Sequence, residues 1–323
     1  MIDRTSLMIG LLAGVTSALL SLGSSTTSLL AILLYAASAL PVLIAGLGWG
    51  NRAAIVAVVT AGLIGLLAVS PYFALLFSVI TLAPAAWLSH LANLARPASE
   101  LGGPDDAMAW YPLSDILTHL CAMVTGAMIV VGVVIGYDNA IAGQMVDMVL
   151  EALKVQEPLY NPDAATIAQM KAIFGLALPL VQGMLWVLLL FTAYYLAVRI
   201  VRASGKALRP AEDLPSMLRM HRNAIFVFLG GLALTFAGGI AAMIGALVCG
   251  TFGAGFLLAG FASLHFRTRG KSWRLPVLWI TYLSVFLFTI PAFLILLTGL
   301  TDTRRTIAVT PSGAATKPEN DET

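Results

Sequence analysis

Charged residues are scarce in this sequence. They make up 11% of the 323 residues, and hydrophobic residues make up 59%, whereas a soluble domain has about 25% charged residues. Several apolar runs also reach the roughly 20 residues that a helix needs to cross the hydrocarbon core of a bilayer. These proportions exclude a soluble globular protein and predict an integral membrane protein that crosses the lipid bilayer many times.

Cysteines and the sequence motifs of enzymes are also missing. The two cysteines, Cys121 and Cys249, lie far apart in apolar runs, so the chain has neither a CxxC metal or redox site nor a disulfide framework. It contains no HExxH zinc motif, no GxSxG nucleophile elbow and no phosphate-binding Walker loop. We therefore expect no enzymatic activity, no cofactor, no metal and no nucleic-acid partner.

Apolar segments predict an all-α transmembrane bundle, a single domain over residues 1–300, with nine spans or alternatively eight. The predicted spans are residues 6–23, 27–48, 52–69, 71–95, 113–136, 172–198, 223–246, 250–266 and 275–299. The glycine-rich stretch 223–266 could instead hold two short helices, one broken helix or a re-entrant turn. Residues 301–323 are polar and are expected to form a disordered tail.

The placement of the charges predicts the orientation of the chain in its membrane. The loop of residues 199–222 has six basic and two acidic residues, and residues 267–274 have four basic residues and no acid. Because basic loops stay in the cytoplasm, both loops are expected there, and the acidic excursion 138–171 is expected outside. Nine spans with a cytoplasmic N-terminus satisfy all three. They place the tail outside despite Arg304 and Arg305, whereas eight spans place it inside.

The acidic excursion contains an amphipathic pattern. Its apolar residues Ile141, Met145, Val149 and Ala152 recur at helical spacing. This pattern predicts an amphipathic helix that lies on the membrane surface or over the bundle. A solvated surface helix and a lid over an external cavity are both compatible with it.

Residues 28–67 predict a helical hairpin with a tight Gly-Trp-Gly-Asn-Arg corner, which the charges place on the cytoplasmic side. The second helix carries Ala53, Ala57, Ala61 and Gly65 at spacings of four. Such a face of small side chains lets another backbone approach closely. We interpret it as a packing or partner face, and the sequence leaves open whether the partner belongs to this chain or to another membrane protein.

Polar residues within apolar segments are the candidate ligand residues. Asp115 and His119 are four residues apart and share a helix face, where they could relay a proton or bind a hydrogen-bonding ligand. After Pro112, however, Ser114 or Asp115 is a natural N-cap of a helix at the membrane border. Gln182 is the second candidate, for either ligand contact or a hydrogen bond between helices.

Two regions resemble a known family. The last predicted span with Ile290-Pro291, its ending Gly299-Leu300-Thr301-Asp302-Thr303-Arg304, and Leu214-Pro215 resemble the YybS-like bacterial membrane proteins, a family of unknown function. That family is distantly similar to the S components of energy-coupling-factor transporters, which bind vitamins or metals, and the hairpin 28–67 carries this similarity. S components have fewer spans and an alanine motif on their first helix, so their ligand residues are not transferred to this chain.

The resemblance and the polar groups together favour binding or transport of a small solute. We expect a cavity between the hairpin 28–67 and the spans 113–136 and 172–198, reached by an external ligand from the end opposite the Gly-Trp-Gly-Asn-Arg corner. The predicted lining residues are Asp115, His119 and Gln182. The alternative function is a non-transporting scaffold or assembly factor that binds another membrane protein through its small-residue helix faces.

Overall fold

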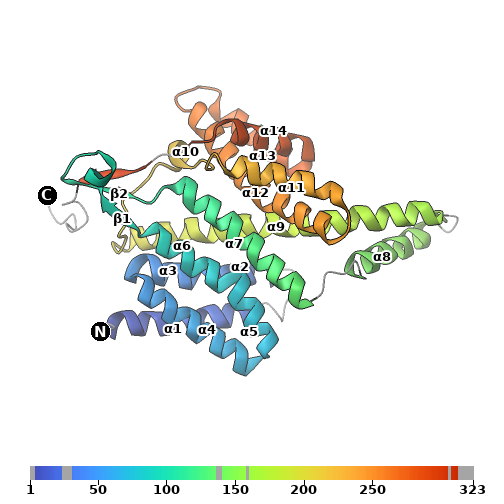
Figure 1. The fold of residues 1–323 in the computed structure, drawn as a ribbon, viewed down its shortest axis with the longest axis horizontal. Coiled ribbons are helices and arrows are strands. Elements are labelled where there is room, and N and C mark those ends of the chain that lie inside the picture. Colours follow the sequence, from blue (N-terminus) through green and yellow to red (C-terminus); the bar gives the residue numbers. More distant parts are fainter. Residues whose placement is uncertain (1–3, 24–30, 136–139, 158–159, 305–306, 312–323) are drawn as a thin grey trace.

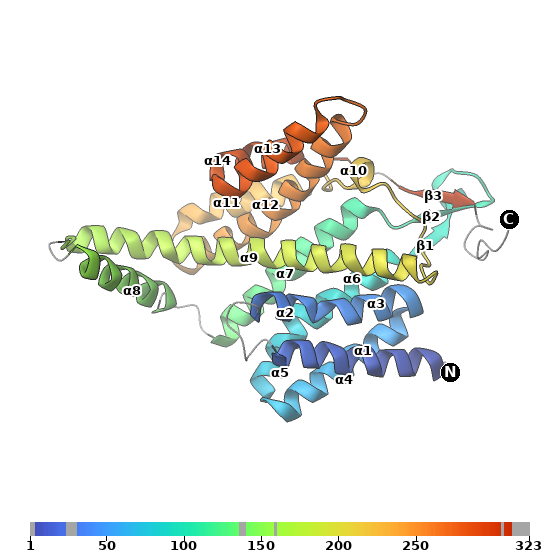
Figure 2. The same cartoon turned by 180° about the vertical axis from the view of Figure 1, so that it is seen from behind.

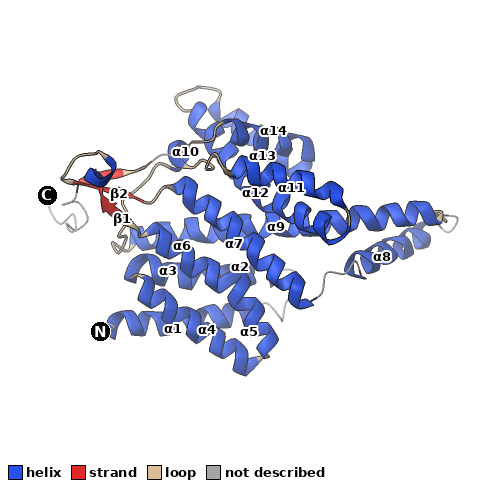
Figure 3. Ribbon diagram, viewed as in Figure 1, coloured by secondary structure: helices blue, strands red, loops and turns tan. Residues whose placement is uncertain are grey.

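The protein is a bundle of helices arranged around one long central helix. The computed structural model describes residues 4–23, 31–135, 140–157, 160–304 and 307–311. Figure 3 shows that the described chain is almost entirely helical and that its strands are confined to a small sheet at one end. The all-α prediction is therefore confirmed, and the small sheet is a feature that the sequence did not predict.

The N-terminal group of helices passes back and forth through the bundle. Its elements are α1 (Arg4–Gly23), α2 (Ala31–Ala37), α3 (Ala39–Trp49), α4 (Asn51–Ala68), α5 (Pro71–Phe77), a π-helical segment (Ser78–Leu82) and α6 (Ala83–Ala92). The π-helical segment precedes Pro84, whose missing N–H leaves the carbonyl of Ile80 without its helical donor. Similarly, α2 and α3 meet at Ser38, three residues before Pro41, so the described part of the predicted span 27–48 is interrupted. Residues 27–30 lie outside the described residues.

Two central helices separate this group from a C-terminal group. The central helices are α7 (Leu113–Ile135) and the 40-residue α9 (Ala164–Ala203). The C-terminal group contains α10 (Leu214–Met217), α11 (Ala224–Leu234), a 3-10 turn (Thr235–Ala237), α12 (Gly239–Arg267), α13 (Arg274–Leu287) and α14 (Thr289–Thr301). Figure 2 shows α9 running between the two groups along most of the length of the molecule.

The break within residues 223–266 lies earlier than predicted. The chain turns at Gly238 and Gly239, whose φ angles of +75° and +56° favour glycine, and α12 then continues without interruption to Arg267. The predicted boundary near residues 247–249 is wrong because the glycines around it serve helix packing. A Cβ at Gly245 would lie 2.6 Å from the carbonyl oxygen of Gly231 in α11.

The predicted single span 275–299 is two helices. α13 and α14 are bent by 119° relative to each other, with Phe288 extended between them. Pro291 explains the position of the break, because its missing N–H cannot bond to the carbonyl of Leu287. The described residues contain six helices long and apolar enough to span a membrane, or seven if the bent pair is one span. This supports a membrane protein, but the predicted nine spans are not confirmed.

One end of the bundle collects the basic loops, and we call it the basic end. It comprises the corner at Gly50 and the loops of residues 93–112, 204–223 and 268–273. Hydrogen bonds join these segments. Asn93 Nδ2 donates to the carbonyl oxygen of Gly46 at 2.9 Å, and Arg209 Nη2 donates to that of Tyr111 at 2.8 Å. The N-terminus of α1 lies at the same end (Figure 1), because α1 runs parallel to α4 with Gly10 against Ala53.

The C-terminal segment also returns to the basic end. Strand β3 (Val309–Pro311) pairs antiparallel with β2 (Ala107–Trp110), which pairs in turn with β1 (Ala95–Pro97); a 3-10 turn (Ala98–Leu101) follows β1. Residues 309–311, expected in a disordered tail, are therefore part of a sheet. These residues lie at the same end as the basic loops. The eight-span alternative places the tail on that side, whereas the nine-span prediction places it on the opposite side. Residues 312–323 lie outside the described residues.

Helix α8 (Ala140–Gln156) forms a hairpin with the first turns of α9, and Figure 1 shows this hairpin projecting at the end opposite the basic end. Lys171 of α9 forms an ion pair with Asp147 of α8 at 3.2 Å. The amphipathic helix was predicted, but its packed face differs by one position: Val149 is exposed. The buried apolar residues are Ala142, Val146 and Leu150. The helix thus packs on α9 rather than over the bundle.

The position of the C-terminal segment can be tested with single cysteines introduced at exposed sites. We expect Arg96→Cys in β1 and Arg304→Cys after α14 to react with a membrane-impermeant maleimide from the same side of oriented vesicles, because both lie at the basic end. Lys154→Cys in α8 should react from the other side. The unsubstituted chain is the control for Cys121, which is buried, and Cys249. Labelling of Arg304→Cys together with Lys154→Cys would contradict this arrangement.

The contact between α1 and α4 gives a second prediction. Gly14→Leu should destabilise the protein by about 1–3 kcal/mol, the usual range for overpacking, because a Cβ there would already lie 2.6 Å from the carbonyl oxygen of Ala57. Thermal unfolding in a neutral detergent measures the loss. Thr16→Leu, on the exposed face of the same helix, is the matched control and should unfold close to the parent temperature; an equal loss in both variants would refute the contact.

Candidate functional site

A pocket of about 650 Å³ lies at the basic end, where the last turns of α9 meet the loop that follows them. The ends of three other elements complete it: Leu47 from α3, Asn93 after α6 and Leu113 at the start of α7. The volume is typical of small-molecule sites in proteins. The pocket therefore lies at the junction of the N-terminal helices, the central helices and the basic loop 204–213.

Arg209 holds the loop against the ends of α6 and α7. Its Nη1 donates to the carbonyl oxygen of Ala92 at 3.1 Å, and its Nη2 donates to that of Tyr111 and to Glu212 Oε1 at 2.8 and 2.7 Å. The Arg209 and Glu212 side chains are only 9% and 8% exposed. Because burial makes an unpaired charge costly, this ion pair lets the loop place a guanidinium in the pocket wall.

Asn93 connects the end of α6 to the end of α3. Its Nδ2 donates to the carbonyl oxygen of Gly46 at 2.9 Å and lies 3.4 Å from that of Leu47. These two acceptors determine the orientation of the amide, because a flipped side chain would put its oxygen against two carbonyl oxygens. The Oδ1 atom therefore points away from α3.

The wall of this pocket contains two unpaired polar atoms. In the part of the chain that the structure describes, four buried side-chain atoms have no hydrogen-bond partner, and two of them, Asn93 Oδ1 and Arg209 Nε, belong to residues that line the pocket. A buried donor or acceptor without a partner costs about 1–3 kcal/mol. Both atoms are buried within the wall of the pocket and are not exposed to its space.

The mouth of the pocket adds charge and aromatic surface. Arg199 and Arg202 project from the last turns of α9, and Arg199 donates to the hydroxyl of Tyr195 at 2.9 Å. Asp213 lines the pocket but is paired with Arg269, whose hydrogen bond lowers the pKa of that carboxyl below its ordinary value. The Asp213 carboxylate is therefore held ionised, and Arg269 balances its negative charge. It does not neutralise Arg199 and Arg202, which keep the mouth of the pocket positive.

A second polar cluster joins the C-terminal segment to the basic end. Arg219, whose side chain is fully buried, donates from Nε to Asp302 Oδ2 at 2.9 Å. Ser263 Oγ donates to the same carboxylate oxygen at 2.8 Å, and Arg219 Nη1 donates to the carbonyl oxygen of Pro215 at 2.9 Å. The cluster ties the end of α14 to α12 and to the segment that follows the pocket loop.

Two predicted ligand residues lie beside each other near the basic end but do not line the pocket. Asp115 is in the first turn of α7, almost fully buried, and receives a hydrogen bond from Ser114 Oγ at 3.3 Å. His119 Nε2 lies 3.1 Å from the hydroxyl of Tyr111, and its ring also lies beside Trp87. Both side chains face neighbours within the chain, and neither is among the pocket residues.

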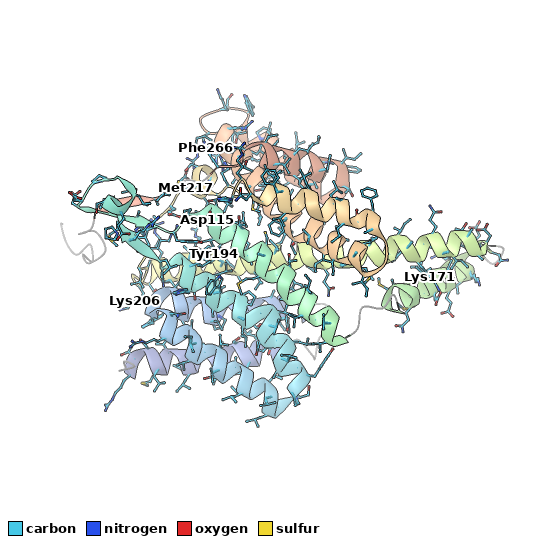
Figure 4. The ribbon with its side chains drawn as sticks, in the orientation of Figure 1. Asp115, Lys171, Tyr194, Lys206, Met217 and Phe266 are labelled. Atoms are coloured by element: carbon cyan, nitrogen blue, oxygen red, sulfur yellow. The ribbon has the colours of Figure 1, made fainter. Side chains whose placement is uncertain are left out.

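Gln182, the third predicted residue, is far from the other two. It is exposed on α9, next to Gly183, which packs against Thr251 of α12. Thr251 is hydrogen-bonded to Thr125, ten residues beyond Asp115, or about 15 Å along α7. The structure therefore does not bring the three predicted residues into one cavity. Figure 4 shows Asp115, Tyr194 and Lys206 toward the basic end and Lys171 at the other.

The predicted small-residue face is occupied within the chain. Ala53, Ala57 and Ala61 are fully buried, with the first two beneath the glycines of α1. Gly65 packs at the end of the face, where an added Cβ would lie 3.3 Å from the ring of Phe73 in α5. In the described residues, the face has no free surface for another protein.

Sequence reasoning missed Arg209, Glu212 and Asn93. It counted Arg209 and Glu212 only as loop charges that set orientation, and it did not consider Asn93. The only local signal is the spacing of three residues between Arg209 and Glu212 in a short loop, which suits an ion pair but does not indicate burial. Comparison of the chain with protein-family models, with curated proteins and with solved structures finds no match, and the resemblance to YybS-like proteins stays a prediction.

The ion pair at Asp302 gives a third prediction. Asp302→Ala should cost about 3–5 kcal/mol of stability, because it leaves the buried Arg219 without its counter-charge. Chemical unfolding in detergent measures the loss. Arg304→Gln is the control: Arg304 is half exposed and 3.6 Å from the same carboxylate, so its loss should cost no more than about 1 kcal/mol. Equal effects of the two substitutions would contradict the buried pair.

Proposed function

We propose that this protein is a multi-pass protein of the bacterial inner membrane that binds or transports a small solute. The observation that supports this function is the pocket of about 650 Å³ at the basic end, whose lining combines the charged groups of Arg199 and Arg202 with apolar and aromatic side chains. The proposal keeps the predicted helices of the cavity, with Leu47, Leu113 and α9 in its wall. It replaces the predicted lining residues, and it moves the cavity to the end with the Gly-Trp-Gly-Asn-Arg corner, whereas the sequence predicted the opposite end.

We propose further that the pocket and the N-terminus face the cytoplasm. The basic loops 204–223 and 268–273 lie at the pocket end, and loops rich in lysine and arginine are retained in the cytoplasm. Arg304 lies at the same end beside Asp302, so the tail does not oppose this orientation. The solute would then enter the pocket from the cytoplasm or from the inner leaflet.

The alternative function, a scaffold for another membrane protein, has less support. The proposed binding face at Ala53, Ala57 and Ala61 is covered by α1. A partner would have to use a different surface. Solute binding therefore ranks first.

Ligand binding can be tested by thermal-shift screening of the purified protein in a neutral detergent against vitamins, nucleobases, metal ions and small organic anions. A ligand present at 100 times its dissociation constant should add about 2.7 kcal/mol of stability. Ala207→Trp should abolish the shift, because this exposed pocket residue can take a large side chain that fills the mouth.

Ala164→Trp is the matched control, since Ala164 is exposed at the far end of α9 and outside the pocket. It should keep the full ligand-induced shift. The absence of any stabilising compound, or an equal loss of the shift in both tryptophan variants, would refute solute binding in this pocket.

A further inference from the structure

We propose that the pocket binds an anionic phospholipid from the membrane leaflet at the basic end, with its phosphate at Arg199 and Arg202 and an acyl chain against the aromatic part of α9. This inference rests on the proposed function, since it names the ligand class for the same pocket. Three features of the pocket support it: the order of the side chains along α9, their exposure at the surface of the bundle, and two arginines without counter-charges.

The wall that α9 contributes to the pocket is one face of the helix. Its residues recur at intervals of three and four: Phe191, Tyr194, Tyr195, Val198, Arg199 and Arg202. Tyr194 is labelled in Figure 4. From Phe191 to Arg202 this face is about 17 Å long, which is close to half of the roughly 30 Å hydrocarbon core of a bilayer. It can therefore follow a ligand from the membrane border into one leaflet.

The character of this face changes along its length. The pocket residues between Phe191 and Val198 are aromatic or aliphatic, whereas Arg199 and Arg202 follow in the last turns of the helix. A small soluble anion would use only the arginine end of this wall. An anionic amphiphile uses both ends, because its affinity combines the burial of apolar surface with the attraction between its charge and basic side chains.

The pocket opens at the surface of the bundle. Arg199 and Arg202 are exposed. Leu196 and Ile200, each next to a pocket residue in the sequence, are 45% and 44% exposed. Since α9 is long and apolar enough to span a bilayer, lipid is the expected neighbour of these two apolar side chains. A lipid of the surrounding leaflet can thus reach the pocket from the side, without passing through the packed interior.

The two arginines at the mouth carry uncompensated charge. In the part of the chain that the structure describes, neither Arg199 nor Arg202 forms an ion pair. Arg199 Nη1 donates to the Tyr195 hydroxyl at 2.9 Å, a bond that uses one of the five N–H groups of the guanidinium. A guanidinium can bind a phosphate through two parallel hydrogen bonds. Basic pockets between spanning helices on the cytoplasmic side are known to bind anionic lipid headgroups in this way.

The acidic residues of the pocket do not offset this charge. Glu212 is paired with Arg209, and Asp213 is paired with Arg269. The cationic group of a zwitterionic lipid would therefore meet arginines without a free carboxylate to pair with it. The pocket thus favours a phospholipid with a net negative charge over a zwitterionic one.

The test measures lipid binding to the purified full chain in a neutral detergent by native mass spectrometry. Dioleoyl phosphatidylglycerol competes with dioleoyl phosphatidylcholine, which has the same acyl chains and no net charge, so partition into the micelle affects both equally. The anionic lipid should be preferred about tenfold or more, because each arginine near an anionic lipid contributes about fivefold.

A second probe separates a lipid from a free phosphate compound. Glycerophosphoglycerol is the same headgroup without acyl chains, and its binding is measured by calorimetry. It should bind at least about tenfold more weakly than the lipid, because it makes no apolar contact with the face between Phe191 and Val198.

Substitutions at exposed sites connect the preference to the pocket. Arg199→Gln and Arg202→Gln should each reduce the preference for phosphatidylglycerol about fivefold, and Ala207→Trp should block the lipid at the mouth. Arg222→Gln is the matched control: it removes the same charge at the basic end from an exposed residue outside the pocket, and it should keep the parent preference.

The outcomes separate this inference from the proposed function. Equal binding of the two phospholipids, or an equal loss in Arg222→Gln and in the two pocket variants, would overturn the inference. Binding of the headgroup alone as tightly as the lipid would also overturn it and would still support a soluble ligand in the pocket. A compound from the broad screen would support the proposed function in the same way if Ala207→Trp abolishes its shift. Failure of the lipid, the headgroup and the broad screen would refute both.

Discussion

Close contact between helices through small residues is the constraint on which the rest of this structure depends. Inside a bilayer, burial from water adds little to helix association, so helices associate mainly by close packing. Gly10 and Gly14 bring α1 onto the backbone of α4, Gly183 and Gly250 join α9 to α12, and Gly260 joins α12 to α14. These contacts set the positions of both helical groups relative to α9. The shape of the pocket, which uses the ends of α3, α7 and α9, follows from them.

The polar chemistry of the protein is concentrated where these helices end. Within the bundle, the Oγ1 atoms of Thr125 and Thr251 lie 2.7 Å apart, so one hydroxyl donates to the other, and the accepting hydroxyl donates its own hydrogen to a carbonyl of its helix. Hydroxyls can be satisfied in this way, but charged groups in a bilayer are expensive without partners. In the described part of the chain, the buried charged side chains lie near the basic end: the pairs Arg209–Glu212 and Arg219–Asp302, and Asp115 in the first turn of α7. A site that recognises charge has to lie there too, which is where the pocket is.

Hydropathy predicted the helices best where a span is uniformly apolar and its ends carry polar residues. The spans at α1, α4 and α7 were predicted to within a few residues. The predictions for residues 223–266 and 275–299 were less accurate, because glycine and proline have more than one role. Gly238 turns the chain with a positive φ, whereas Gly250 lets α9 approach α12, and nothing in the neighbouring sequence distinguishes these uses. Proline likewise lies within the continuous helix α9 at residue 179 but follows the break between α13 and α14.

The amino-acid sequence alone was enough to establish a helical protein with membrane-spanning segments and to locate its basic loops, because hydropathy and charge are properties of short stretches of chain. The members of the candidate site depended on contacts between distant parts of the chain. Arg209 belonged to a basic loop and Asn93 to the end of an apolar run, and neither pattern indicated a ligand group. They came to line one pocket only when folding placed the loop against the carbonyls of Ala92 and Tyr111 and the end of α6 against Gly46. Local patterns do not encode such contacts, since they arise from packing between helices that are remote in the sequence.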